Sequence, residues 1–362
     1  MTKQTAQTFD IRFPVAFGSG LATALLFLAA RQQSAFAALI LASLAPLPIM
    51  IATLGFGHLT GLGAAFAAPI TIAAFVAAAN AAAFSTKVLV AAALNGLIFA
   101  VALSLPVWGL AWLATTGRSQ VFLPWLRGLV HAAEPESEPV ERPVAQARYP
   151  FGDILLSIAA IAVFIVSIVL VIWVVRNGGY AKALASAAAH VEPMIVEMIG
   201  ARDLPKTLDL MTLAKIVIKI MPAVGACLIT FALAANLWLA GRVVELSHRL
   251  PYPWPDIPHD LRVPRLLALV FAACCGLAFI DNLAGGIART AAASLGILFV
   301  LQGLAVVHDL TRGMRFRTSL LCGLYLAIGF LMPWPFVIFA VIGLIDAGLR
   351  LRDKKPAAPP KS

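Results

Sequence analysis

Long apolar runs follow one another along this chain of 362 residues, separated by short polar segments. A helix rises about 1.5 Å per residue, so about 20 apolar residues cross the roughly 30 Å hydrocarbon core of a bilayer. Hydrophobic residues make up 61% and charged residues 12% of the chain, more apolar surface than a soluble fold buries. The sequence therefore predicts an all-α integral membrane protein, a polytopic helical bundle with no large soluble enzyme domain. The predicted spans are 14–30, 35–54, 59–84, 88–115, 153–175, 214–240, 264–283 and 287–307.

The last apolar stretch, 319–349, is too long for one comfortable span and is broken by Pro333 and Pro335. Basic clusters lie on both sides of it, in residues 312–317 and 350–355. Because Lys and Arg are enriched on the cytoplasmic side of membrane proteins, a hairpin of two short helices places both clusters there. We therefore expect about ten membrane helices, the last two a short Pro-turn hairpin, with both termini cytoplasmic. One long kinked helix is the alternative.

Two polar segments divide the predicted spans. Residues 134–150 are rich in Pro and Glu with no apolar period, which is typical of a flexible segment. This predicts an N-terminal four-helix block (1–116), a cytoplasmic linker (117–150), a C-terminal six-helix block (151–349) and a disordered tail (350–362).

In residues 180–210, Leu184, Val191, Ile195 and Met198 recur at helical spacing. This spacing predicts an amphipathic helix on the outer side. Such a helix lies either on the membrane surface or packed against the bundle.

The sequence contains no signature of an enzyme. It has no HExxH zinc motif, no GxSxG nucleophile motif, no P-loop and no dinucleotide-binding glycine pattern. The four cysteines all lie in apolar runs, without the paired spacing of a metal site. We therefore expect no catalytic residues, no cofactor and no bound metal. The net charge of +10 lies mostly in short loops, where it indicates membrane orientation rather than nucleic-acid binding.

Polar residues inside apolar spans are costly and are functional candidates. Counting the rise per residue from the predicted inner edge places one group at the level of the outer leaflet. We interpret this group as a substrate-binding site open to the outside, whose basic members attract an anion. The alternative is a set of interfacial caps with a local Asp281–Arg289 ion pair. Asn236 and Gln302 lie deeper and are expected to hydrogen-bond between helices. The outer group comprises Asn80, Asn95, Lys215, Lys219, Asp281, Asn282 and Arg289.

The cytoplasmic side has a Pro-rich segment, 250–265, which is predicted to be extended and to present Trp254. Together with Arg312 and Arg315 it is a candidate binding surface for a protein partner, because aromatic and arginine side chains dominate interface energetics. The alternative is that Trp254 anchors in the headgroups and that the arginines only set membrane orientation.

Several stretches carry a resemblance to a known family: RYPFGDILLS (148–157), PWPDIPHDLRVPR (253–265), LQGLAVVHDLTRGMRFR (301–317) and LASLAPLPIMIATLGFGH (41–58). In these the chain resembles the YybS family of bacterial predicted membrane proteins of unknown function. That family is distantly similar in fold to the S-components of energy-coupling-factor transporters. Those proteins bind small solutes from the outer side and work with a membrane coupling protein and ATPases.

Together these observations favour a small-solute-binding or transporter-like component without its own ATPase, in the bacterial cytoplasmic membrane. Its surroundings would be the lipid bilayer, with a membrane or cytoplasmic protein partner on the cytoplasmic face. The alternative function is a non-catalytic membrane scaffold that organises cell-envelope or division machinery. A third alternative is an integral membrane enzyme that acts on lipid, with Lys215 and Lys219 at the phosphate headgroups.

Overall fold

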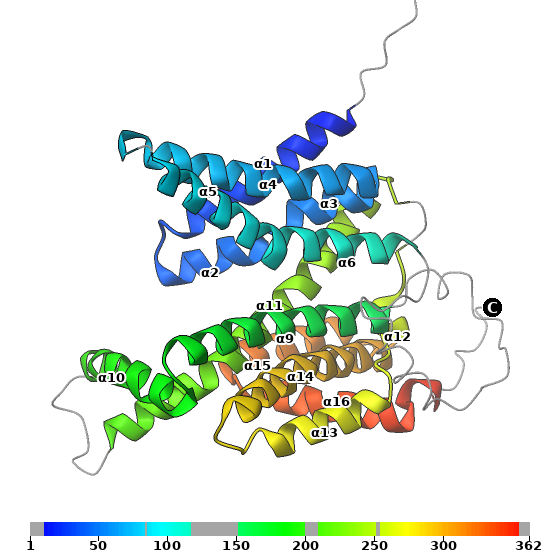
Figure 1. The fold of residues 1–362 in the computed structure, drawn as a ribbon. Helices are drawn as coiled ribbons and strands as arrows, with labels where there is room; N and C mark the ends of the chain where they lie inside the picture. Colours follow the sequence, from blue (N-terminus) through cyan, green and yellow to red (C-terminus); the bar gives the residue numbers. More distant parts are fainter. Residues whose placement is uncertain (1–10, 84, 117–150, 200–208, 251–253, 355–362) are drawn as a thin grey trace, which may run out of the picture. The chain divides into compact units, whose positions relative to one another are not determined.

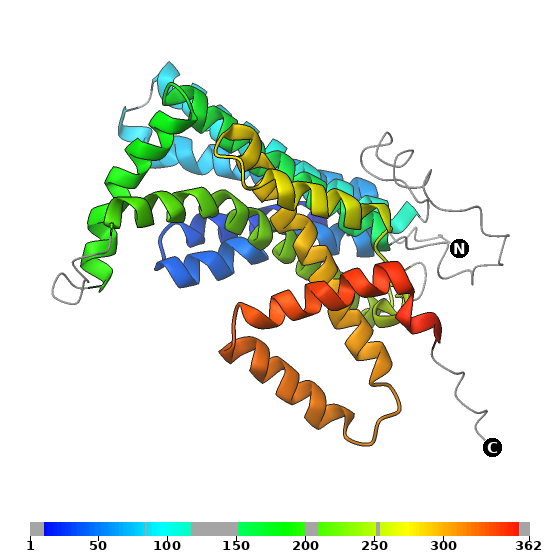
Figure 2. The ribbon, with the colours of Figure 1, turned by 90° about the horizontal axis from the view of Figure 1, so that it is seen from below.

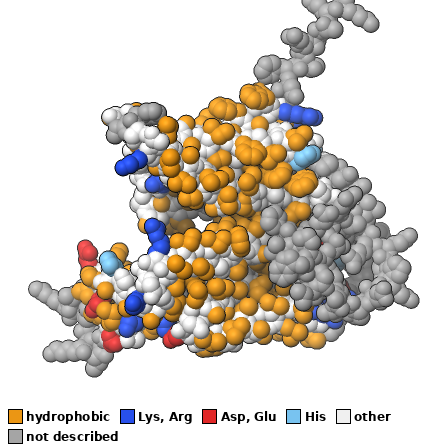
Figure 3. Space-filling view, in the orientation of Figure 1, with side chains coloured by type: hydrophobic (Ala, Val, Ile, Leu, Met, Phe, Trp, Pro, Cys, Tyr) orange, Lys and Arg blue, Asp and Glu red, His pale blue; other side chains and the backbone are white. Residues whose placement is uncertain are grey.

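The computed structural model describes residues 11–83, 85–116, 151–199, 209–250 and 254–354. Within these ranges every regular element is a helix, so the prediction of an all-α membrane protein is confirmed. On the face seen in Figure 3, hydrophobic side chains cover most of the described helices. The predicted linker 117–150 lies outside the described residues.

Seven helical stretches in the described part of the chain are long and apolar enough to cross a bilayer. Three shorter apolar helices are α13 (Leu266–Leu277), α15 (Arg317–Phe330) and α16 (Trp334–Leu349), and their crossing stays a prediction. The long stretches are α1 (Arg12–Ala30), α2 with α3 (Ala35–Leu44, Leu47–Phe56), α4 (His58–Ala79), α5 to α6 (Thr86–Phe99, Leu105–Thr116), α9 (Phe151–Arg176), α11 (Leu210–Leu246) and α14 (Leu283–Leu310).

The contacts divide the chain into two compact units. The first contains α1 to α6 and residues 232–255, and the second contains α9, α10, the start of α11 and residues 256–362. The long helix α11 therefore contributes to both units, a division that differs from the predicted blocks 1–116 and 151–349.

Small residues allow close helix packing in the first unit. A Cβ at Gly20 of α1 would lie 2.5 Å from the Cβ of Ala67 on α4, and one at Gly96 of α5 would lie 2.8 Å from the carbonyl oxygen of Pro69. Without a hydrophobic driving force between helices in lipid, such close approach is what stabilises their association.

The second unit is built around α14, which packs against α9 on one side and α16 on the other (Figure 1). Gly303 of α14 faces the backbone of α16, where a Cβ would lie 2.0 Å from the carbonyl oxygen of Phe339. Gly343 of α16 repeats this arrangement against the carbonyl oxygen of Phe299, also at 2.0 Å. These two helices are therefore in backbone contact at two successive levels.

The predicted amphipathic segment contains helix α10 (Tyr180–Ile199). Ala188 and Ile195 are buried against Ala214 near the start of α11, and Val191 packs beside them. The helix therefore packs against the bundle, which was one of the two alternatives.

Helices α15 and α16 are separate and joined by a short turn at Pro333, as Figure 2 shows, so the hairpin is confirmed over the single kinked helix. The prediction of a disordered tail from residue 350 is wrong for its first residues. Leu351–Lys354 form a 3-10 helix, η3, and Arg352 is buried, because the Arg352 side chain binds groups in the second unit.

We predict that Gly303→Ala lowers the stability of the protein by about 1–3 kcal/mol, because the added methyl group overlaps a backbone carbonyl that cannot move alone. Thermal unfolding of the purified protein in detergent measures the effect. Gly323→Ala on α15 is the matched control, since a Cβ there has no neighbour within 4 Å. The control should be neutral or stabilising, because Ala favours a helix interior over Gly. Equal melting temperatures for the two variants would contradict the close packing of α14 and α16.

Candidate functional site

The residues predicted to form an outer substrate site are divided between the two units. Asn80 and Asn95 belong to the first unit, and each donates from Nδ2 to a carbonyl of its own helix, Val76 and Ala91, at 2.8 Å. The other five belong to the second unit. The two asparagines therefore have local structural partners.

Two of the five form an ion pair. Lys219 Nζ of α11 lies 2.8 Å from both carboxylate oxygens of Asp281, in the turn between α13 and α14. The hydrogen bond from Lys219 lowers the pKa of the Asp281 carboxyl, and the charge of Lys219 adds to the effect. The partner of Asp281 is thus Lys219 rather than Arg289. Lys215 lies one turn earlier on α11. Hydrogen bonds from Thr212 lower the pKa of the Asp209 carboxyl, and the charge of Lys215 makes a smaller contribution in the same direction.

Arg289 and Asn282 stabilise the ends of helices. Asn282 Oδ1 accepts from the backbone N–H of Gly285 at 2.9 Å, as a helix N-cap. Arg289 donates to the carbonyl of Ala278 at 2.6 Å, just beyond the end of α13, and to the Tyr180 hydroxyl at 2.7 Å. These contacts match the expected interfacial caps, and binding of a substrate by this group stays a prediction.

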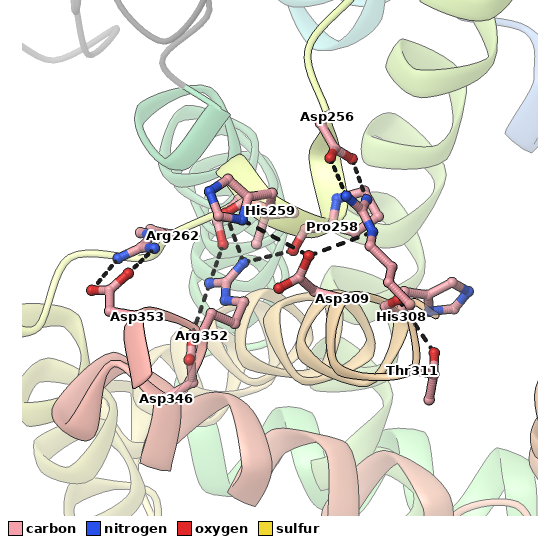
Figure 4. Close-up of polar contacts among 12 residues, drawn as sticks. Asp256, Pro258, His259, Arg262, His308, Asp309, Thr311, Asp346, Arg352 and Asp353 are labelled. Carbon is pink, nitrogen blue, oxygen red and sulfur yellow. Dashed lines mark hydrogen bonds and ion pairs between the residues drawn. The ribbon is translucent and has the colours of Figure 1, made fainter. Parts of the chain in front are cut away.

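A polar network at the opposite end of the second unit surrounds a buried ion pair (Figure 4). Arg352 of η3 donates to Asp346 of α16 at 2.8 Å, and their side chains are 1% and 3% exposed. Gln302 of α14 donates to the same carboxylate oxygen at 2.8 Å and accepts from the backbone N–H of Val263 at 2.9 Å. The prediction that Gln302 bonds between helices is confirmed.

Arg352 also holds the Pro-rich segment. Its guanidinium donates to the carbonyls of Pro258, His259 and Leu261, at 2.8, 3.1 and 2.7 Å. Only the short helix α12 (Ile257–Asp260) forms in this part of the segment, so carbonyls at and beyond its end need partners from elsewhere. One arginine supplies them and fixes the segment to the ends of α14 and α16.

Two further ion pairs, both exposed, complete the network. Arg312, after α14, binds both carboxylate oxygens of Asp256 and lies 3.4 Å from Asp309. Arg262 binds both oxygens of Asp353 at 2.9 and 2.5 Å. In each pair the hydrogen bonds to arginine hold the carboxyl pKa below its ordinary value.

The three residues predicted to bind a partner differ in their surroundings. Trp254 is 9% exposed and packs against Gly241, where a Cβ would lie 2.3 Å from the ring. The expectation that the segment presents Trp254 is therefore wrong, because the ring fills the space left by a glycine. Arg312 is engaged by Asp256, and Arg315 is exposed.

The first unit contains two helical irregularities at one depth, one break and one π-helical segment. The span 35–56 is broken between α2 and α3 at Ala45 and Pro46, and the span 86–116 contains a π-helical segment, η2 (Ala100–Ser104). Asn236 of α11 donates to the carbonyl of Ser43, beside the break, at 2.6 Å. This confirms that Asn236 bonds between helices and shows how a freed carbonyl is satisfied.

Buried polar atoms without partners occur at the same depth. Thr23 and Ser104 are 0% exposed, and their hydroxyls have no hydrogen-bond partner among the described residues. Oδ1 of Asn236 is also buried and has no hydrogen-bond partner among the described residues. The depth of each group can be counted from the helix ends at Arg12, Phe56, Thr116 and Leu246. The rise per residue gives about 15–18 Å, or about half of a 30 Å core, for all four groups: Thr23, the break after Ala45, Ser104 and Asn236. We call this group the midplane layer.

Sequence reasoning missed Thr23, Ser104 and Arg352. Pro46 and Pro48 signal the break in the second span. A threonine or serine in an apolar helix carries no such signal, because its hydroxyl usually bonds to its own backbone. The position of Arg352 after the last span resembled a solvated tail.

We predict that Arg352→Met costs about 3–5 kcal/mol of stability, because it leaves the buried carboxylate of Asp346 without its charge partner. Arg262→Met is the matched control, since it breaks an exposed pair and should cost at most about 1 kcal/mol. Denaturant unfolding in detergent measures both. Equal losses would show that the Asp346–Arg352 pair is not buried in the folded protein.

Comparison with known proteins gives one match. The model of a family described as predicted membrane protein (DUF2232) matches residues 146–347, which is more than half of the chain. No curated protein and no solved structure matches the chain. The matched part includes α9 to α15, nearly all of α16 and the whole of the Pro-rich segment. The chain belongs to the DUF2232 family of predicted membrane proteins.

Proposed function

We propose that this protein is a small-solute-binding, transporter-like membrane component with no catalytic activity and no ATPase of its own. The observation that carries the proposal is the midplane layer of the first unit. Transporters bind substrates near the centre of the bilayer, at breaks in helices where backbone and side-chain groups lack helical partners. The break between α2 and α3, the π-helical segment η2 and the buried polar atoms without partners among the described residues support this assignment.

The chemistry of the layer indicates the kind of solute. Thr23 and Ser104 supply hydroxyls, and Asn236 supplies an amide oxygen. None of these groups carries a charge, so the layer suits a small uncharged polar molecule or a monovalent cation. The resemblance to the YybS family, and through it to S-components, supports a solute-binding role and a bacterial origin.

The orientation follows from charge. In the second unit, Arg262, Arg265, Arg312, Arg315, Arg317, Arg350 and Arg352 lie at the end that contains the polar network. On the positive-inside rule we propose that this end faces the cytoplasm, in the bacterial cytoplasmic membrane, with both termini cytoplasmic.

A membrane scaffold is the second candidate function, and the polar network favours it. Asp346, Arg352 and Gln302 fix the Pro-rich segment against helix ends, which gives the cytoplasmic face a defined surface for a protein partner. Such a surface would also serve a transporter component that needs a separate energy-supplying protein.

A thermal-shift screen of the purified protein tests the two functions. The panel comprises vitamins, sugars, amino acids and the cations Na⁺ and K⁺. We expect at least one solute to raise the melting temperature, and Thr23→Val and Ser104→Ala each to weaken its binding about tenfold, the effect of one lost hydrogen bond.

Thr115→Val is the matched control, because the Thr115 hydroxyl bonds to the carbonyl of Trp112 at the end of α6. Binding unchanged in both Thr23→Val and Ser104→Ala would contradict a site in the midplane layer. A panel without any shift would favour the scaffold.

A further inference from the structure

Two arginines between the end of α14 and the first residue of α15 take no part in the polar network. Arg312 turns back to Asp256 and Asp309, but Arg315 is exposed and Arg317 is half-buried. Among the described residues, neither Arg315 nor Arg317 has a carboxylate within ion-pair distance. These two positive charges therefore lack a counter-ion within the described chain.

The side chain of Arg317 and the start of α15 add to this positive charge. The Nε–H of Arg317 is buried and has no acceptor among the described residues. Helix α15 begins at this arginine, with Phe316 as its N-cap, no side-chain cap and no acidic residue in its first turn. Free backbone N–H groups and the helix dipole at such an end favour an anion, so an arginine there without one is electrostatically unfavourable.

Exposed apolar side chains lie next to these charges in the sequence. Phe316 is 74% exposed and Met314 is 53% exposed, and both alternate with the arginines in the sequence Met-Arg-Phe-Arg. The helix that follows is apolar, so on the predicted crossing of α15 the segment lies where headgroups meet the hydrocarbon. A water-soluble anion would satisfy the charges but would leave Phe316 and Met314 in water.

We propose that residues 314–317 bind the phosphate headgroup of an anionic phospholipid. Arg315 and the guanidinium of Arg317 bind the phosphate at the start of α15, and Phe316 and Met314 contact the acyl region. The surface belongs to the second unit, so this role does not depend on solute binding in the first unit.

Titration with phospholipids, followed by thermal unfolding of the full chain in a zwitterionic detergent, tests this proposal. Phosphatidylglycerol should raise the melting temperature, whereas phosphatidylcholine and soluble glycerol phosphate at equal concentration should not. Arg315→Gln with Arg317→Gln should weaken phosphatidylglycerol binding about 25-fold, from roughly fivefold for each basic residue at an anionic surface. Arg315→Lys with Arg317→Lys should retain most of the binding.

The matched control is Arg265→Gln with Arg350→Gln, which removes the same charge from exposed positions at the same end of the unit. Its binding should change less than about threefold. An equal loss in the control would overturn the proposal, because it would show a general effect of charge. An equal shift with glycerol phosphate would overturn it in favour of a soluble anion.

A second measurement leaves both arginines in place. Phe316→p-benzoyl-phenylalanine, irradiated in native membranes, should crosslink to phospholipid, which mass spectrometry identifies. Crosslinks to a polypeptide in place of lipid would overturn the proposal and would assign this surface to a protein partner.

Discussion

Polar groups buried away from water must find partners within the protein, because apolar surroundings offer none. The second unit depends on this constraint most clearly at Asp346. Arg352 and Gln302 both bind this buried carboxylate, and the same two side chains bind backbone groups of the Pro-rich segment. One cluster therefore joins α14, α16 and a non-helical segment. Removal of Gln302, Asp346 or Arg352 would take a hydrogen-bond partner from another buried group of the cluster.

The same constraint separates two kinds of polar residue. Lys219, Asp281 and Arg289 looked functional in the sequence, yet each has a partner that explains its presence. Thr23 and Ser104 were inconspicuous, and their buried hydroxyls have no partner in the described part of the chain. A buried polar group without a partner is costly, so its retention requires another reason, such as a ligand. This difference directs the proposed function to the midplane layer.

Much of the fold could be predicted from the apolar runs, because span length and bilayer thickness are linked. The charge clusters around 319–349 predicted the hairpin, and the depth of Asn236 and Gln302 predicted their bonds between helices. The pairing of Arg352 with Asp346 could not be predicted, because tertiary packing determines it. In the sequence Arg350, four residues after Asp346, was an equally good partner for this carboxylate. Whether the hydroxyls of Thr23 and Ser104 are buried depends on how each helix is rotated about its axis. An apolar sequence without periodicity does not specify that rotation.

The most direct test compares the stability of the protein without added solute after removal of each kind of polar group. Gln302→Leu leaves the N–H of Val263 and the carboxylate of Asp346 with fewer partners, so it should cost about 1–3 kcal/mol or more. Ser104→Ala and Thr23→Val remove hydroxyls without partners and should change stability by less than about 0.5 kcal/mol, or increase it. Denaturant unfolding in detergent gives all three values. A loss for Ser104→Ala as large as that for Gln302→Leu would contradict the account, because it would show that the hydroxyl holds the fold together.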